Sequence, residues 1–98
     1  MDEDIDFEAA AEHIWQGHRI LMDWVREACS DDDRVILDPD PASRSGQSLR
    51  IVGFSASFGH PVTVVGFRRR THIEITSAWR SNPRDQRIYR ERQGNDGR

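Results

Sequence analysis

The chain has 98 residues, of which 36% are hydrophobic and 32% charged, and these values indicate one soluble globular domain with a modest core. No segment reaches the roughly 20 apolar residues of a membrane span. The single cysteine, Cys29, excludes an internal disulfide framework and a cysteine metal cluster. We therefore expect one cytoplasmic domain over residues 1–98, no membrane contact, and flexible ends at residues 1–6 and 93–98.

The charges are segregated along the chain, although the net charge is only −3. Residues 1–40 hold thirteen acids and three arginines, a net charge of −10. Residues 41–67 hold two arginines and no acid, and residues 68–98 hold nine arginines and four acids, a net charge of +5. The pattern indicates either a basic face for an anionic partner or an acidic half that folds onto a basic half. Both alternatives stay open.

Two helices are predicted at the N-terminal end, because apolar residues recur there at helical spacing. The first begins at Phe7, with Asp6 as N-cap and Gly17 as its stop. Its apolar stripe holds Phe7, Ala10, Ala11, Ile14 and Trp15. The second helix ends in the Ser30-Asp31-Asp32-Asp33 run and has a stripe of Leu21, Trp24, Val25 and Ala28.

Four strands are predicted next, over residues 34–37, 49–55, 62–68 and 71–78. The loop over residues 38–48 is rich in Pro, Ser, Asp and Gly, and its length is typical of a mobile or functional loop. A hairpin turn over residues 57–61 joins the second and third strands. The last three strands therefore form an antiparallel meander.

A C-terminal helix follows the last strand, with Asn82 as N-cap and Pro83 at its first position. Asp85 completes a shortened capping box, Ile88 points inward, and the helix ends near Arg92. The class is α+β, with two N-terminal helices, an antiparallel sheet of three to four strands and one C-terminal helix. A strand that ends at an arginine-rich helix N-terminus is a favourable place for a phosphate.

Several motifs of the chain resemble those of the BrnT family of bacterial toxins, relatives of the RelE/ParE-like fold. They are Ile75-Thr76-Ser77-Ala78-Trp79-Arg80, Asp85-Gln86-Arg87-Ile88-Tyr89, Arg50-Ile51-Val52-Gly53, Gly59 with Val62-Thr63-Val64-Val65, and His18-Arg19-Ile20. The resemblance spans roughly residues 10–90. In an ungapped match Trp79 stands where the family has an arginine. The family also tends to begin with a short strand, where this sequence predicts a helix.

The resemblance implies a metal-independent endoribonuclease that cuts messenger RNA and is held in check by a cognate antitoxin. The antitoxin would cover the basic groove between the sheet and the C-terminal helix. Such cleavage requires a base for the 2′-hydroxyl, cations for the phosphorane and an acid for the leaving oxygen. No cofactor and no metal are expected, and His13 and His18 lack the spacing of ligands on one helix face.

Four residues are the candidates for catalysis. Arg50 and Arg80 form the predicted cationic clamp, because their strand ends can share an edge of the meander. His18 is the candidate base, with a histidine that serves the helix dipole as the alternative. Tyr89 is expected to stack on a base or donate to phosphate, with packing against the sheet as the alternative.

Further residues are candidates for contact with nucleic acid or a partner chain. Trp79 would stack on a nucleobase, anchor a partner or cover the sheet edge. Arg68, Arg69 and Arg70 form a hairpin turn that either keeps the edge soluble or contacts RNA or antitoxin. Arg84 and Arg87 on the C-terminal helix complete this set.

A second function class stays open, namely a non-enzymatic module of the same fold that binds nucleic acid or protein. Trp79 in the place of an arginine supports it, as does the lack of a strong acid–base pair. The helices that carry tryptophan also leave a homodimer open.

Overall fold

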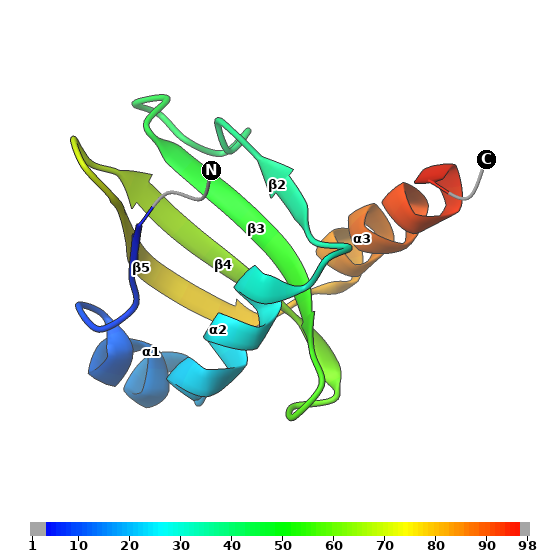
Figure 1. Cartoon of the computed structure of the whole chain (residues 1–98), viewed down its shortest axis with the longest axis horizontal. Helices are drawn as coiled ribbons and strands as arrows, with labels where there is room; N and C mark the ends of the chain where they lie inside the picture. The colour runs from blue at the N-terminus through cyan, green and yellow to red at the C-terminus, as the bar shows by residue number, and fades with distance from the viewer. Residues whose placement is uncertain (1–3, 97–98) are drawn as a thin grey trace.

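The computed structural model describes residues 4–96, which form one sheet with helices on both faces (Figure 1). The elements are β1 (Ile5–Asp6), α1 (Ala11–His18), α2 (Met22–Ser30), β2 (Val35–Leu37), β3 (Ser48–Ser55), β4 (His60–Arg68), β5 (Ile73–Arg80) and α3 (Pro83–Asp96). The predicted α+β class is confirmed. Residues 1–3 and 97–98, which we expected to be flexible, lie outside the described residues.

The sheet has five strands in the order β1-β5-β4-β3-β2, so the predicted number of three to four is wrong. The strands from β2 to β5 pair antiparallel, whereas β1 is parallel to β5, with Ile5 opposite Ile73. The N–H of Ile73 also donates to the carbonyl of Asp4 at 2.8 Å. Ile5 and Asp6 were expected to be flexible. A two-residue strand has no periodicity that a sequence pattern can show, so the sequence did not predict β1.

The helix boundaries differ from the prediction at both ends of the chain. The first helix begins at Ala11, since Asp6 belongs to β1 and its carboxylate accepts the N–H of Glu8 at 3.0 Å in a turn. Gly17 does not stop it; Arg19 ends it in the left-handed conformation, with φ of 56°. At the other end α3 continues past Arg92 to Asp96, so residues 93–96 are helical.

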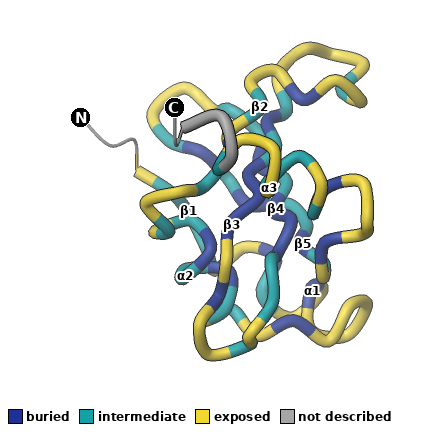
Figure 2. Tube along the Cα trace, turned by 90° about the vertical axis from the view of Figure 1, so that its right-hand side faces the viewer, coloured by how far each residue is buried: buried dark blue, intermediate teal, exposed yellow. Residues whose placement is uncertain are grey.

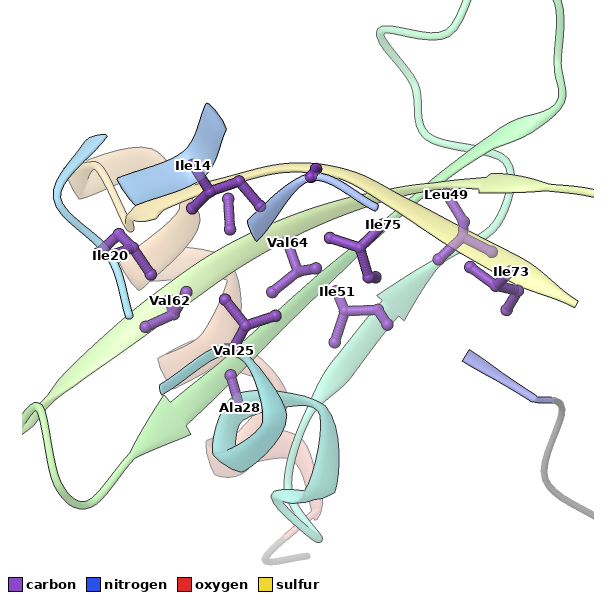
Figure 3. Close-up of a cluster of buried hydrophobic side chains, with 12 residues drawn as sticks. Ile14, Ile20, Val25, Ala28, Leu49, Ile51, Val62, Val64, Ile73 and Ile75 are labelled. Carbon is purple, nitrogen blue, oxygen red and sulfur yellow. The ribbon is translucent and has the colours of Figure 1, made fainter. Parts of the chain in front are cut away.

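The main core lies between the sheet and the pair α1 and α2 (Figure 3). The sheet contributes Leu49, Ile51, Val62, Val64, Ile73, Ile75 and Ala78, and the helical segment contributes Ala10, Ile14, Ile20, Val25 and Ala28. A Cβ on Gly53 would lie 2.0 Å from the carbonyl oxygen of Ala28, so the backbone of α2 rests directly on β3.

Two large residues of the predicted helical stripes are exposed and lie outside this core. Trp15 is 41% exposed and Leu21 is 43% exposed. The late start of α1 leaves Ile14 as its one buried residue, and Leu21 is the N-cap of α2 rather than part of its inner side. Buried positions follow the strands, whereas exposed positions gather in turns and on outer helical sides (Figure 2).

The third helix packs on the opposite face of the sheet, beside β2 and β3. There Val35 and Val52 are cross-strand partners and are both fully buried, although neither belongs to the main core. Asn82 caps the helix as predicted, because its Oδ1 accepts the N–H of Asp85 at 2.8 Å. Within residues 4–96 no helix combines the length and the apolar content that crossing a membrane requires.

Candidate nucleic-acid interface

The sheet has a face turned away from α1 and α2, and α3 covers this face mainly beside β2 and β3, although its first turn also contacts Thr63 of β4. On its other half, five side chains of β4 and β5 are partly exposed, and we call this surface the open face. It consists of Val65, Phe67, Glu74, Ser77 and Trp79. It is bordered by the first turn of α3 and by the end of α1.

A β-bulge in β5 decides which residues reach the open face. Gly66 pairs with Ile75 and Val65 pairs with Ser77, so Thr76 is an extra residue, and its hydroxyl donates to the carbonyl of Val65 at 3.2 Å. Such an extra residue reverses the alternation of side chains that follows it. Trp79 therefore points to the open face, although it has the same sequence parity as Ile75 in the core.

Arg50 lies beside the open face, and two carboxylates bind it. Its Nη1 is 3.2 Å from Asp85 Oδ2, and its Nε is 3.3 Å from Asp40 Oδ2. The side chains of Asp85 and Asp40 are only 1% and 6% exposed, against 17% for Arg50. Thr63 donates to Asp85 at 2.8 Å, and its hydroxyl lies 2.7 Å from that of Ser81. The charge of Arg50 is thus compensated inside the protein.

Trp79 lies between Arg50 and His18. The Arg50 guanidinium carbon is 5.8 Å from the centre of the Trp79 ring. The His18 ring is also 5.8 Å from the Trp79 ring, at an interplanar angle of 49°. The structure therefore brings together three of the predicted residues, and His18 is the last residue of α1, where a basic side chain also suits the helix dipole.

The three arginines of the predicted turn have separate surroundings. Arg69 lies over the Phe67 ring, with its guanidinium carbon 4.4 Å from the ring centre, and its Nε is 2.9 Å from Glu74 Oε1. Arg68 forms an ion pair with Asp38. Both of these residues line a cavity of about 860 Å³ on the helix-covered face. Arg70 is exposed at the turn between β4 and β5.

Arg80 does not join Arg50, so the predicted clamp is absent from the structure. Arg80 pairs with Val62 and thus lies on the face that α1 and α2 cover, whereas Arg50 lies on the opposite face. The strands β3 and β5 run parallel to each other, since both are antiparallel to β4. Arg50 is opposite Val65 and Arg80 is opposite Val62, so the two arginines are also three residues apart along β4.

Tyr89 is held away from the open face. Its hydroxyl donates to Asp31 Oδ2 at 2.6 Å and joins α3 to the corner between α2 and β2. Burial and this hydrogen bond raise the pKa of Tyr89 above its ordinary value. Gln93 strengthens the same junction by donating to the carbonyl of Asp33 at 2.9 Å. Tyr89 therefore anchors α3 in this structure.

Arg84 and Arg87 are exposed on α3, and neither forms an ion pair within residues 4–96. Arg84 also lines a small cavity of about 60 Å³ together with Arg50 and Asp85. The acidic half folds onto the basic half in part, because Asp38 and Asp40 pair with later arginines. A basic face is also present in part, because the arginines of α3 are exposed.

Sequence reasoning missed the residues that compensate Arg50. Asp85 was interpreted as part of a capping box, and its buried carboxylate instead accepts from Arg50 and Thr63. Asp40 lies in the long loop, where it is buried and also accepts the N–H of Ala42 at 3.0 Å. Within the described part of the chain, no three His, Cys, Asp or Glu side chains are placed to hold a metal ion.

The residues of this site lie far apart in the sequence, and the fold brings them together on one side of the sheet. They are His18, Asp40, Arg50, Trp79 and Asp85. No protein-family model matches the chain, and no curated protein is significantly similar to it.

Proposed function

We propose that this protein is the toxin component of a type II toxin–antitoxin pair and that it acts on messenger RNA through the open face. The observation that carries the proposal is the group of Trp79, His18 and Arg50 at one end of that face. Trp79 stands at the position where the resembling toxins have an arginine. A cytoplasmic location and a cognate antitoxin belong to the same proposal.

The order of the elements supports this function. A short strand precedes two helices, an antiparallel meander and a C-terminal helix, and β1 agrees with the short strand with which the BrnT family tends to begin. The match concerns the fold, and a fold alone does not fix an activity. The assignment therefore depends on a test of the open face.

His18 is the proposed general base of the cleavage reaction. It lies at the exposed end of α1 beside Trp79, where a bound ribose could reach its ring. Imidazole is the side chain that most often serves as a general base near neutral pH. Arg84 would supply charge to the phosphate, because its guanidinium group is exposed and forms no ion pair in the described part of the chain.

A second candidate function is binding without cleavage. The observation in its favour is the compensation of Arg50 by Asp40 and Asp85. These carboxylates leave little net positive charge at the position where a phosphorane would need it. The bound partner would then be RNA, an antitoxin-like protein or a second copy of the chain.

The test is induced expression in a bacterial host, with growth and messenger-RNA integrity followed together. We expect the wild type to arrest growth and degrade RNA, and His18→Ala to do neither while remaining folded. His13→Ala is the matched control, because His13 is exposed on the same helix. Growth arrest with intact RNA would favour binding without cleavage. Normal growth with intact RNA would contradict the toxin proposal.

A further inference from the structure

The open face carries two aromatic rings that point to the same side of the sheet. Trp79 is opposite Thr63 on β4, and Phe67 lies four residues further along that strand. At about 3.3 Å per residue these two positions are roughly 13 Å apart along the strand direction. Val65 and Ser77 form the floor between them.

Each ring has a planar cationic or imidazole group beside it. Trp79 has the guanidinium of Arg50 and the ring of His18, and Phe67 has the guanidinium of Arg69. Aromatic rings and guanidinium planes are the groups on which unpaired RNA bases stack. An apolar protein partner would have to cover these polar planes, so the arrangement favours a nucleic acid over a second protein.

The distribution of charge on the open face also favours a nucleic acid. Carboxylates compensate the arginines beside the rings, since Arg50 pairs with Asp40 and Asp85, and Arg69 pairs with Glu74. The arginines at the border are different, because Arg70 at the turn and Arg84 on α3 are exposed without an ion pair in residues 4–96. A polyanion would therefore meet free cations at the border and nearly neutral stacking surfaces within.

We propose that the open face binds single-stranded RNA by stacking one base on Trp79 and another on the Phe67–Arg69 pair, with phosphates held only by Arg70 and Arg84. This inference rests on the proposed action on RNA and adds how the RNA is held. Binding by stacking predicts a weak salt dependence. Two phosphate contacts give a slope of log K against log salt of about −1.4, whereas four contacts that include Arg50 and Arg69 give about −2.8.

The test is fluorescence anisotropy with labelled eight-nucleotide uridine and adenosine RNA, between 50 and 200 mM salt as the range. Trp79→Leu should weaken binding by about tenfold or more with an unchanged slope. Trp79→Phe keeps a ring and should stay within about threefold of the wild type. Arg70→Ala should instead make the slope shallower by about 0.7. Trp15→Leu is the matched control, because Trp15 is exposed on α1 outside the open face.

A second measurement covers the case in which Trp79→Leu is unfolded. In the Trp15→Phe, Trp24→Phe protein, Trp79 is the remaining tryptophan, and saturating RNA should quench its fluorescence. RNA binding without quenching, or with full affinity in a folded Trp79→Leu variant, overturns the stacking proposal and leaves an action on RNA intact. A wild type that binds neither RNA overturns both proposals. Self-association that Trp79→Leu abolishes would identify the face as a dimer interface and overturn the inference.

Discussion

Nη1 of Arg50 lies 3.2 Å from both carboxylate oxygens of Asp85, and this pair joins the centre of the sheet to the first turn of α3. The arginine that the sequence offered as a phosphate clamp is therefore committed to the fold. An anion at this position would compete with Asp85 and Asp40 for the same guanidinium group. Removal of Arg50 would also leave two buried carboxylates without their cation, so its loss is a poor test of activity.

Replacement of Asp85 by alanine should lower the free energy of unfolding by about 3 kcal/mol or more, because it breaks a buried ion pair and leaves Thr63 without its acceptor. Urea unfolding at neutral pH measures the change. Asp32→Ala is the control, because Asp32 is exposed at the corner after α2 and should change stability by less than about 0.5 kcal/mol. Equal stability of the two variants would contradict a structural role for the pair.

Tyr89→Phe should cost about 1.5–3 kcal/mol at pH 7, because the lost hydrogen bond has a charged acceptor, Asp31. Burial raises the pKa of Asp31, but hydrogen bonds from Tyr89, the N–H groups of Phe54 and Asp33, and the charge of Arg34 together lower it below its ordinary value. A carboxylate with a lowered folded-state pKa stabilises the fold above its unfolded-state pKa of about 3.9, and this contribution disappears as the pH falls through the folded-state value.

Urea unfolding of wild type and Tyr89→Phe at a series of pH values tests this coupling. The difference between the two proteins should be largest near neutral pH and shrink below the ordinary pKa of aspartate, about 3.9. A difference that stays constant into acid would show that Tyr89 acts by packing alone.

Two glycine substitutions should have opposite effects. Gly53→Ala should destabilise the protein by about 2 kcal/mol or more, because its Cβ would lie 2.0 Å from the backbone oxygen of Ala28 and push α2 off the sheet. Gly17→Ala should stabilise it by about 0.5–1 kcal/mol, since Gly17 is inside α1 and a Cβ there has no neighbour within 4 Å. Thermal unfolding of both variants shows directly whether each substitution raises or lowers the stability.

Glu27 fastens the β3–β4 hairpin to α2. Its carboxylate accepts from the Ser57 hydroxyl at 2.6 Å, the Ser57 N–H at 2.9 Å and the Ser55 hydroxyl at 2.7 Å. These bonds lower the pKa of Glu27, and the bond from the Ser57 hydroxyl contributes most. Its stabilising effect is present above the ordinary glutamate pKa and is lost as the pH falls through the lowered value.

Glu27→Gln should therefore speed hydrogen exchange in residues 56–59 at pH 7 and leave a smaller difference from the wild type in acid. Glu12→Gln is the control, because among residues 4–96 Glu12 accepts only from Gln16 on the surface of α1. Unchanged exchange in the hairpin after Glu27→Gln would contradict this role.

Local patterns in the sequence predicted most of the elements. The helical stripes located α1 and α2, turn residues located the β3–β4 hairpin, and Asn82 with Pro83 marked the start of α3. These features depend on neighbouring residues, so a sequence displays them directly. The strand β1 was missed because its pairing with Ile73 is a long-range contact.

The surroundings of the candidate site depend on distant residues and were predicted less well. Asp85 is far along the chain from Arg50, and no local spacing joins them. The proposed edge shared by Arg50 and Arg80 failed because β3 and β5 run in the same direction and the two side chains lie on opposite faces of the sheet. One signal was present, since the apolar positions Ile73, Ile75 and Ala78 break the strict alternation of a regular strand.

The bulge at Thr76 sets the register of the strand end that follows it. If β5 kept all its residues but paired with β4 without the bulge, the indole of Trp79 would turn toward α1 and α2, and the guanidinium of Arg80 would take its place on the open face. A slip of one residue would thus convert an aromatic surface into a cationic one without any change of sequence. In this strand, register selects the exposed chemistry as strongly as residue identity does.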